Sequence, residues 1–272
     1  MCKTYSYFSV FHRRFEGSDH DSGWSSQPVA RTIGPAVLAR GTGEGELDVQ
    51  WLMGVAPTIP TTVWATVGQR YDPGDKKYDN EPFLRWIVAV SNASQVPNVF
   101  TISYQDYEDT LSRAFMLRMN TEFAALALRG TTVTTGSGDW GVGCSAAGDF
   151  RSDFPSSSPY VLSVGATTFA GAHPTPERGA ESGIHFSSGG FSNVFQTPAY
   201  QQAHVRRFLR TCPVRGALFN RSGRAFPDVS AVGWQFQYVI NGAVGHVGGT
   251  SASSPAFAAG FGVAHNSRKA AI

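Results

Sequence analysis

The sequence predicts an α/β fold in which helices cover both faces of a central, mostly parallel sheet. Short β-rich runs alternate with helical patterns of about ten residues or more, which is typical of strands joined by right-handed crossovers. No internal repeat interrupts this alternation. Hydrophobic residues make up 42% of the 272-residue chain, and a chain of this length and composition can bury a full core.

The first half of the chain supplies alternating helical and strand patterns. The expected elements are, in order, a buried helix over 46–55, a β-rich strand over 61–67, a helix over 81–91, an apolar strand over 99–104 and the longest helix over 110–128. Arg129 and Gly130 follow this last helix and form a typical C-terminal end.

The second half begins with two more strands and then changes character. The expected features are strands over 131–135 and 160–167, irregular Gly- and Ser-rich surface loops over 170–225, a hairpin over 236–247 and an apolar buried helix over 251–264. Asn241-Gly242 is the turn of the hairpin, because this dipeptide favours the backbone of a tight two-residue loop. In such parallel sheets, ligands bind at the carboxyl ends of the strands.

The composition argues against several classes of partner. The 22 basic and 20 acidic residues give a formal net charge of +2 and are dispersed, so we expect no nucleic-acid partner. No apolar run approaches the roughly 18 residues that span a bilayer, so we expect no membrane partner. The N-terminus lacks the basic start and apolar core of a signal peptide. We expect a monomer.

The segment Gly248 to Pro255 places Ser251 at the first turn of an apolar helix, directly after glycines. Free backbone N–H groups at a helix N-terminus stabilise negative charge that develops on an attacked carbonyl. Glycines before the serine let a substrate backbone approach. Ser251 is therefore a candidate nucleophile. It is about equally well explained, on this segment alone, as a helix N-cap.

Glu44 and Asp48 lie four residues apart, so a helix would place them on one face. Two carboxyls at this spacing repel each other unless one holds a proton and donates it to the other. Such a pair titrates as a unit and can serve as a general base in acid. Taken alone, the pair is better explained as a solvated acidic helix start.

Asp139 lies in the Gly-rich segment 135–141, which follows a β-rich run. An acid at the carboxyl end of a strand is well placed for a functional site, although a plain turn is the commoner explanation. The seven histidines offer no partner for Ser251 in an apolar strand end or helix start. If Ser251 is activated, a carboxylate is the better candidate for its base.

These three elements, in this order, resemble the sedolisin family of acid-acting serine peptidases. The family motif around the nucleophile, Ser-Gly-Thr-Ser-x-Ser-x-x-Pro, is matched here except that Gly248 stands in place of the first Ser. The family's Glu and Asp lie four apart on one helix, as Glu44 and Asp48 do, and its Ser-Gly-Asp-x-Gly motif contains Asp139. Further stretches extend the resemblance to the lysosomal tripeptidyl-peptidase branch over about residues 30–262.

The resemblance implies a subtilisin-like three-layer α/β fold with a central, mostly parallel sheet, incomplete at both termini. It implies that Glu44 takes the proton of Ser251, that Asp48 orients Glu44, and that a protonated Asp139 donates to the oxyanion. The substrates would be peptides or proteins and the compartment lysosomal. The sequons at Asn92 and Asn220 are possible N-glycosylation sites where the family carries them.

The resemblance also implies a division of the chain and several alternatives. We expect a divergent, mostly looped segment over 1–29, a partial peptidase catalytic domain over 30–265 and a tail over 266–272. The family binds calcium, but its ligands are expected to be missing from this chain. The alternatives to a tripeptidyl-peptidase-like enzyme are an inactive truncated fragment, a non-catalytic peptide-binding relative and a sedolisin endopeptidase.

Overall fold

The structure is a computed structural model, and part of the chain is described by it. The described residues are 6–7, 31–33, 43–57, 59–64, 66–67, 82–146, 148–169, 180–214 and 216–270. Most of the segment 1–29 and the expected start of the second helix at residue 81 lie outside these ranges.

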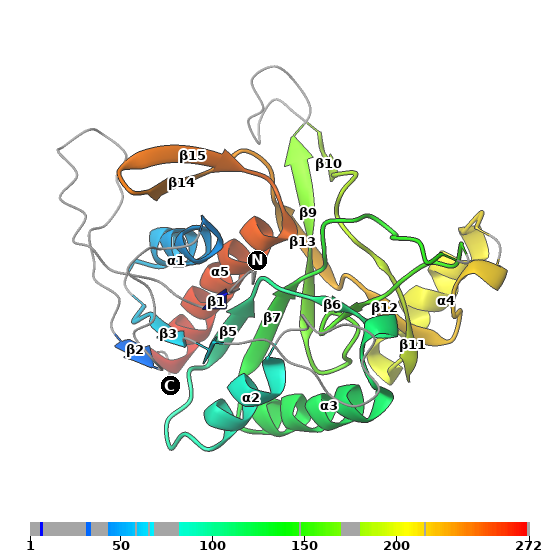
Figure 1. The fold of residues 1–272 in the computed structure, drawn as a ribbon, viewed down its shortest axis with the longest axis horizontal. Helices are drawn as coiled ribbons and strands as arrows, with labels where there is room; N and C mark the ends of the chain where they lie inside the picture. Colours follow the sequence, from blue (N-terminus) through cyan, green and yellow to red (C-terminus); the bar gives the residue numbers. More distant parts are fainter. Residues whose placement is uncertain are drawn as a thin grey trace, which may run out of the picture.

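A central parallel sheet runs through the molecule with helices on both of its faces (Figure 1). Four strands pair in parallel in the order β5-β7-β9-β13, and β10 pairs antiparallel with β9. Their bounds are Val99–Ile102 (β5), Thr132–Gly136 (β7), Leu162–Phe169 (β9), Glu181–Gly183 (β10) and Val229–Val232 (β13). The predicted α/β fold with a mostly parallel sheet is confirmed.

Four helices form the outer layers. Helices α1 and α5 lie together on one face of the sheet, and α2 and α3 lie together on the other (Figure 1). Their bounds are Gly43–Val55 (α1), Phe83–Ser91 (α2), Arg113–Leu128 (α3) and Thr250–Ala270 (α5). Each was expected from its pattern, with ends that differ by a few residues.

Alternation along the strands explains this layering, because successive side chains point to opposite faces of a sheet. Phe100 of β5 and Val133 of β7 join the buried aromatic core with α2 and α3. The hydroxyls of Thr101 and Thr134 point the other way and meet the Ser254 hydroxyl of α5 at 2.9 and 3.3 Å. Polar contacts therefore fix α5 against the sheet.

Local signals set the ends of α3, the longest predicted helix. The Ser112 hydroxyl caps its N-terminus by accepting from the Phe115 backbone N–H at 3.2 Å. Gly130 follows its C-terminus with φ +82°, a left-handed conformation that favours glycine. The helix buries Phe115, Met119 and Phe123 against the sheet.

Smaller strand pairs surround the sheet. They are β1–β4 (Ser6–Tyr7 with Thr66–Val67), β2–β3 (Arg31–Ile33 with Thr62–Trp64), β6–β8 (Asp106–Tyr107 with Asp153–Phe154), β11–β12 (Gly190–Gln196 with Gly223–Phe226) and β14–β15 (Phe236–Ile240 with Ala243–Val247). The last pair confirms the predicted hairpin, with Asn241 and Gly242 at φ 52° and 77° in its turn. The strand expected over 61–67 divides into β3 and β4.

The expectation of irregular surface loops over 170–225 is wrong. This stretch contains β10, β11, β12 and the helix α4 (Gln202–Thr211), besides two 3-10 turns at Ala199–Gln201 and Gly216–Leu218. Strand β11 is rich in Gly, Ser and Asn, so its local pattern is weak. It becomes a strand because β12, far along the chain, pairs with it antiparallel around a register shift.

The structure describes elements at both ends of the predicted division, which stays a prediction. Within the segment 1–29, Ser6–Tyr7 forms β1 and pairs with β4. Helix α5 continues to Ala270, although a tail was expected from residue 266. The sequence from Val263 to Ala270 contains neither Gly nor Pro that would end a helix.

Candidate functional site

Ser251 lies in the first turn of α5, at the carboxyl end of the parallel strands. Gly249 turns the chain into the helix, and its N–H donates to the Gly233 carbonyl at 2.8 Å. The Ser251 side chain is half-buried, and its hydroxyl donates to the Ser103 backbone carbonyl at 3.3 Å. Because a helix N-terminus carries partial positive charge, the surroundings of Ser251 favour developing negative charge.

Helix α1 presents Glu44 and Asp48 to this helix start. Its buried Leu47 packs with Phe236 of β14 and Ala252 of α5. Gln50 fixes the rotation of α1, because its side chain donates to the Val239 carbonyl at 2.7 Å and accepts from the Val239 N–H at 2.8 Å. With this face turned to α5, the carboxyls on the same side of α1 face Ser251.

Asp48 is the more deeply buried of the two carboxyls, with 8% of its surface exposed. Its Oδ1 accepts a hydrogen bond from the Ser103 hydroxyl at 2.8 Å. Burial and the charge of Glu44 raise the pKa of Asp48 well above its ordinary value, and the Ser103 bond opposes the rise only in part. Asp48 therefore keeps its proton at pH values at which an exposed aspartate is ionised.

Glu44 lies between Asp48, Ser251 and Asp139. Burial raises the pKa of Glu44 to about 7, the Ser251 side chain lowers it by hydrogen bonding, and the charge of Asp139 adds to the rise. Among the described residues, Oε1 of Glu44 has no hydrogen-bond partner although it is buried. This oxygen is free to accept a proton from a neighbouring group.

Asp139 follows β7 in the loop that the Gly-rich segment forms. Its Oδ1 accepts two hydrogen bonds from Thr250, from the backbone N–H at 2.7 Å and from the hydroxyl at 2.9 Å. Burial raises the pKa of Asp139 more than these two bonds lower it. A proton on this carboxyl belongs on Oδ2, since Oδ1 already accepts twice.

The free oxygen of Asp139 lies beside the backbone that leads into α5. A Cβ added to Gly249 would lie 2.9 Å from Oδ2 of Asp139, so a side chain there would displace the carboxyl. Glycine is required at this position because the carboxyl approaches the Gly249 backbone closely. Oδ2 consequently lies next to the segment that carries Ser251.

The structure thus brings Glu44, Asp48, Asp139 and Ser251 together at the junction of α1, α5 and the sheet. Sequence reasoning missed Ser103 as part of this group. Ser103 contacts both Asp48 and the Ser251 hydroxyl, and it directly follows β5, at the sheet edge where ligands bind. Its place near the end of the strand expected over 99–104 was the available signal.

The remaining candidates lie apart from this group. Asn92 is exposed at the end of α2, whereas Asn220 is half-buried and its side-chain N–H donates to the Ser192 carbonyl at 2.8 Å. The side chains of His185, His204 and His246 are exposed. The partners of the Ser251 hydroxyl in the described structure are the Ser103 carbonyl and the Glu44 carboxyl, not a histidine.

Within the described ranges, no group of three or more His, Cys, Asp or Glu side chains could hold a metal ion. No helix within the same ranges is both long and apolar enough to cross a bilayer.

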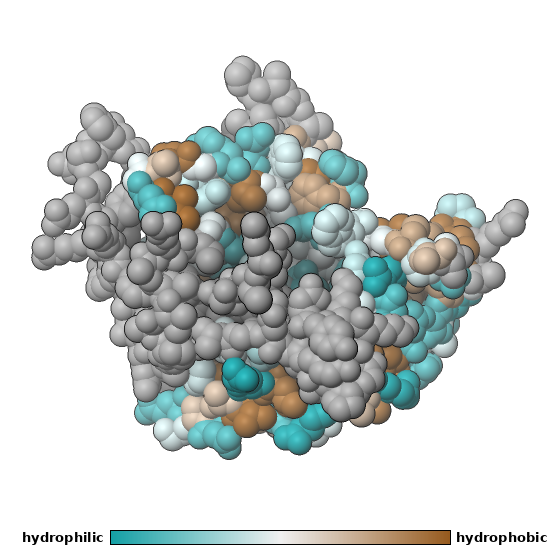
Figure 2. Space-filling view, viewed as in Figure 1, coloured by the Kyte–Doolittle hydropathy of each residue, from teal (hydrophilic) through white to brown (hydrophobic). Residues whose placement is uncertain are grey.

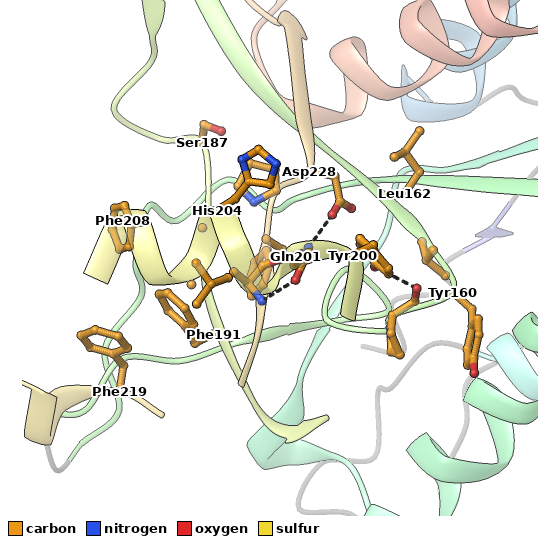
Figure 3. A pocket seen from close by; sticks show the side chains of 18 of the residues that line it. Tyr160, Leu162, Ser187, Phe191, Tyr200, Gln201, His204, Phe208, Phe219 and Asp228 are labelled. Carbon is orange, nitrogen blue, oxygen red and sulfur yellow. Dashed lines mark hydrogen bonds between the residues drawn. The ribbon is translucent and has the colours of Figure 1, made fainter. Parts of the chain in front are cut away.

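A cavity of about 1100 Å³ lies next to α4, away from the four grouped residues (Figure 3). Apolar side chains, several of them aromatic, form most of its lining, and hydrophobic side chains also gather over α4 on the surface (Figure 2). Asp228 lies at the cavity wall, but its carboxyl is occupied by Gln201 at 2.7 Å and Arg224 at 2.5 Å. The cavity therefore offers mainly apolar surface.

Comparisons with known proteins identify relatives of this chain. No protein-family model matches the chain. The chain is 42% identical to tripeptidyl-peptidase 1 of Pongo abelii over 239 residues, which are 86% of this chain and 41% of that protein. It is also 42% identical to tripeptidyl-peptidase 1 of Homo sapiens over 235 residues, 84% of this chain and 40% of the relative. It thus spans about two fifths of the length of these curated relatives.

A solved structure matches the fold. Pseudomonas sedolisin, a serine-carboxyl proteinase complexed with two molecules of pseudo-iodotyrostatin, superposes with a TM-score of 0.65 at 22% identity. The match covers 90% of this chain and 69% of the sedolisin chain.

Proposed function

Because this chain is a homologue of the tripeptidyl-peptidase 1 proteins and has the sedolisin fold, we propose that it is a serine-type peptidase that acts in acid. The observation that carries this proposal is the gathering of three carboxyls around one serine hydroxyl. Ser251 lies at a helix N-terminus, Glu44 and Asp48 face it from α1, and Asp139 faces it from the loop after β7.

Ser251 is the nucleophile in this proposal, and Glu44 is its general base in the fraction of molecules in which Glu44 is ionised. The Ser251 oxygen attacks the peptide carbonyl carbon while its proton moves to Glu44, which then gives the proton to the leaving amine. A water molecule then hydrolyses the acyl-enzyme by the same route and restores Ser251. Asp48 holds a proton of its own and orients Glu44, with Ser103 fixing the Asp48 carboxyl.

Asp139 is the donor to the tetrahedral oxyanion. Only a protonated carboxyl can donate, and burial raises the pKa of Asp139, which supports this role. The two bonds from Thr250 to Oδ1 leave Oδ2 as the donating atom. The rate should therefore fall as pH rises, because Asp139 loses the proton that it donates.

The substrate class that we propose is peptides with a free N-terminus, from which a tripeptide is released. The name of the homologous proteins supports it, and the raised carboxyl pKa values support an acidic compartment such as the lysosome. A peptide chain is the only partner that the proposal requires.

Hydrolysis of an Ala-Ala-Phe reporter peptide by the full chain, followed from acid to neutral pH, tests the proposal. We expect turnover that falls as pH rises from acid towards neutral, because Asp139 loses its proton, and that is abolished in Ser251→Ala and Asp139→Asn. Ser253→Ala is the matched control, since this buried hydroxyl lies in the same helix and has no hydrogen-bond partner within the described residues.

Two results would contradict the proposal. One is activity that peaks at neutral pH, because it cannot depend on a protonated Asp139. The other is a cooperatively folded protein that hydrolyses no peptide at any pH. The same reporter with a blocked N-terminus separates the substrate classes, because a tripeptidyl peptidase needs the free amine and an endopeptidase does not.

A further inference from the structure

Asp153, the first residue of β8, is a buried carboxyl that the proposed mechanism does not use. Only 5% of its surface is exposed, and its strand pairs with β6 so that it lies opposite Tyr107. Burying a carboxyl is costly unless it is hydrogen-bonded. The groups that face Asp153 electrostatically are Arg151, Glu108 and Asp139. Its position beside Asp139 suggests a role at the site.

Ser188 links Asp153 to the loop that carries Asp139. The Ser188 side chain is 1% exposed and hydrogen-bonds to the Asp153 carboxyl. The Ser188 hydroxyl oxygen also accepts from the Trp140 backbone N–H at 3.1 Å. Because a hydroxyl has one hydrogen and the carboxyl can accept it, Ser188 donates to Asp153 while it holds Trp140.

The backbone of Ser188 holds the other side of the same loop. Its N–H donates to the Gly138 carbonyl at 2.8 Å. Ser188 therefore binds the residue before Asp139 through its main chain and the residue after Asp139 through its side chain. Both bonds act on the turn from Gly138 to Trp140, and both depend on how Ser188 is oriented.

Gly138 shows how closely these groups fit together. Its φ of +110° is in the region that favours glycine, and a Cβ there would lie 2.7 Å from both Asp153 Oδ2 and Ser188 Oγ. The carboxyl and the hydroxyl thus pack directly against the Gly138 backbone. This close contact leaves the turn little freedom to move relative to Asp153.

We infer that Asp153 is a positioning residue, which acts through Ser188 to fix the Gly138–Trp140 turn and so aims the Asp139 carboxyl at the substrate carbonyl. The inference rests on the proposed peptidase function. Catalytic groups must be held within about 0.5 Å of their productive geometry, and a misplacement of roughly 1 Å can lower a rate about 100-fold.

The protonation state of Asp153 indicates which substitution at this position is conservative. Burial raises the pKa of Asp153 to about 7, opposed by the Ser188 bond and by Arg151 and supported by Glu108 and Asp139. The carboxyl is therefore neutral in acid. We call the bonds from Asp153 through Ser188 to the Gly138–Trp140 turn the clamp. Asn has the same shape as a neutral Asp and a carbonyl oxygen that accepts from Ser188, so Asp153→Asn should preserve the clamp. Asp153→Ala and Ser188→Ala should break it.

Hydrogen exchange of the Trp140 backbone N–H in the full-length chain tests the inference without requiring catalysis. In acid we expect exchange at least about 10-fold faster in Asp153→Ala and Ser188→Ala, and within about 3-fold of the original protein in Asp153→Asn. In peptide hydrolysis, the two disruptive variants should lose about 10- to 100-fold in kcat with little change in KM.

Ser163→Ala is the control. The Ser163 hydroxyl is buried, lies outside the clamp and has no hydrogen-bond partner among the described residues. Unchanged Trp140 exchange in both Asp153→Ala and Ser188→Ala would overturn the inference. So would faster exchange in Ser163→Ala to the same degree, because the effect would then be general loosening. Faster exchange in the clamp variants alone, in a protein that hydrolyses no peptide, would support the clamp and refute the peptidase function.

Discussion

The substitution Glu44→Gln tests whether a buried carboxyl lies beside Ser251. A group whose pKa is raised in the folded state binds more protons there than in the unfolded chain. The free energy of unfolding then falls as pH rises through the interval between the two values. The contribution of Glu44 is therefore favourable below its ordinary pKa of 4.5 and is lost as pH rises through about 7.

The expected size follows from the two values. A rise in the Glu44 pKa from 4.5 to about 7 corresponds to about 3 kcal/mol, at about 1.4 kcal/mol for each pH unit. Because Gln is neutral at every pH, Glu44→Gln should remove this fall in the free energy of unfolding at higher pH. Between pH 4 and pH 8 the variant should gain stability relative to the original protein by up to about 3 kcal/mol.

Urea unfolding followed by circular dichroism at several pH values measures this difference. Glu46→Gln is the matched control, because it removes another carboxyl from the same helix turn. An oxygen of the Glu46 carboxyl accepts from the Gln50 side chain at 2.9 Å. The control should keep the pH dependence of the original protein. An identical pH dependence for Glu44→Gln would refute the placement of the Glu44 carboxyl in a desolvated group.

Three further predictions concern the surroundings of the site and the surface. Thr250→Val should destabilise the fold by about 1–3 kcal/mol in urea unfolding, because the hydroxyl bonds to two groups of the Asp139 loop; a change near zero would contradict this. Gly248→Ser should cost about 1–3 kcal/mol because its Cβ would lie 2.1 Å from the Trp234 ring. Trp234→Ala should relieve that cost in a double-mutant cycle, and additive effects would count against the packing. After expression through a secretory pathway, glycopeptide mass spectrometry should find fuller occupancy at the exposed Asn92 than at Asn220, whose amide is engaged.

The parts of the fold that could be predicted are those with strong local signals. The helix expected over 110–128 forms over Arg113–Leu128 between a Ser N-cap and a C-terminal Gly, and the hairpin has Asn241-Gly242 in its turn. The segment 170–225 was not predictable in this way. Its strand β11 depends on pairing with β12, which no local pattern in that segment indicates.

The site could be proposed in outline because its motifs resemble those of the sedolisin family, since the local patterns alone favoured a solvated helix start and a plain turn. Spacing placed Glu44 and Asp48 on one helix face, and a strand end placed Asp139 at the ligand-binding edge of the sheet. The link between them could not be read from the chain, because Ser103 and Ser188 act through contacts with residues distant in sequence. Residues of this kind have no signature other than their position after a strand or beside glycines.

Covalent labelling of Ser251 measures the central claim most directly. The full chain is treated near pH 4 with a serine-directed acyl-fluoride or chloromethyl-ketone peptide, and the adduct is located by peptide mass spectrometry. The account predicts a single adduct on Ser251 that forms far more slowly in Glu44→Gln and is absent in Ser251→Ala. Labelling of Ser251 at an equal rate in Glu44→Gln, or an adduct on other serines alone, would contradict it.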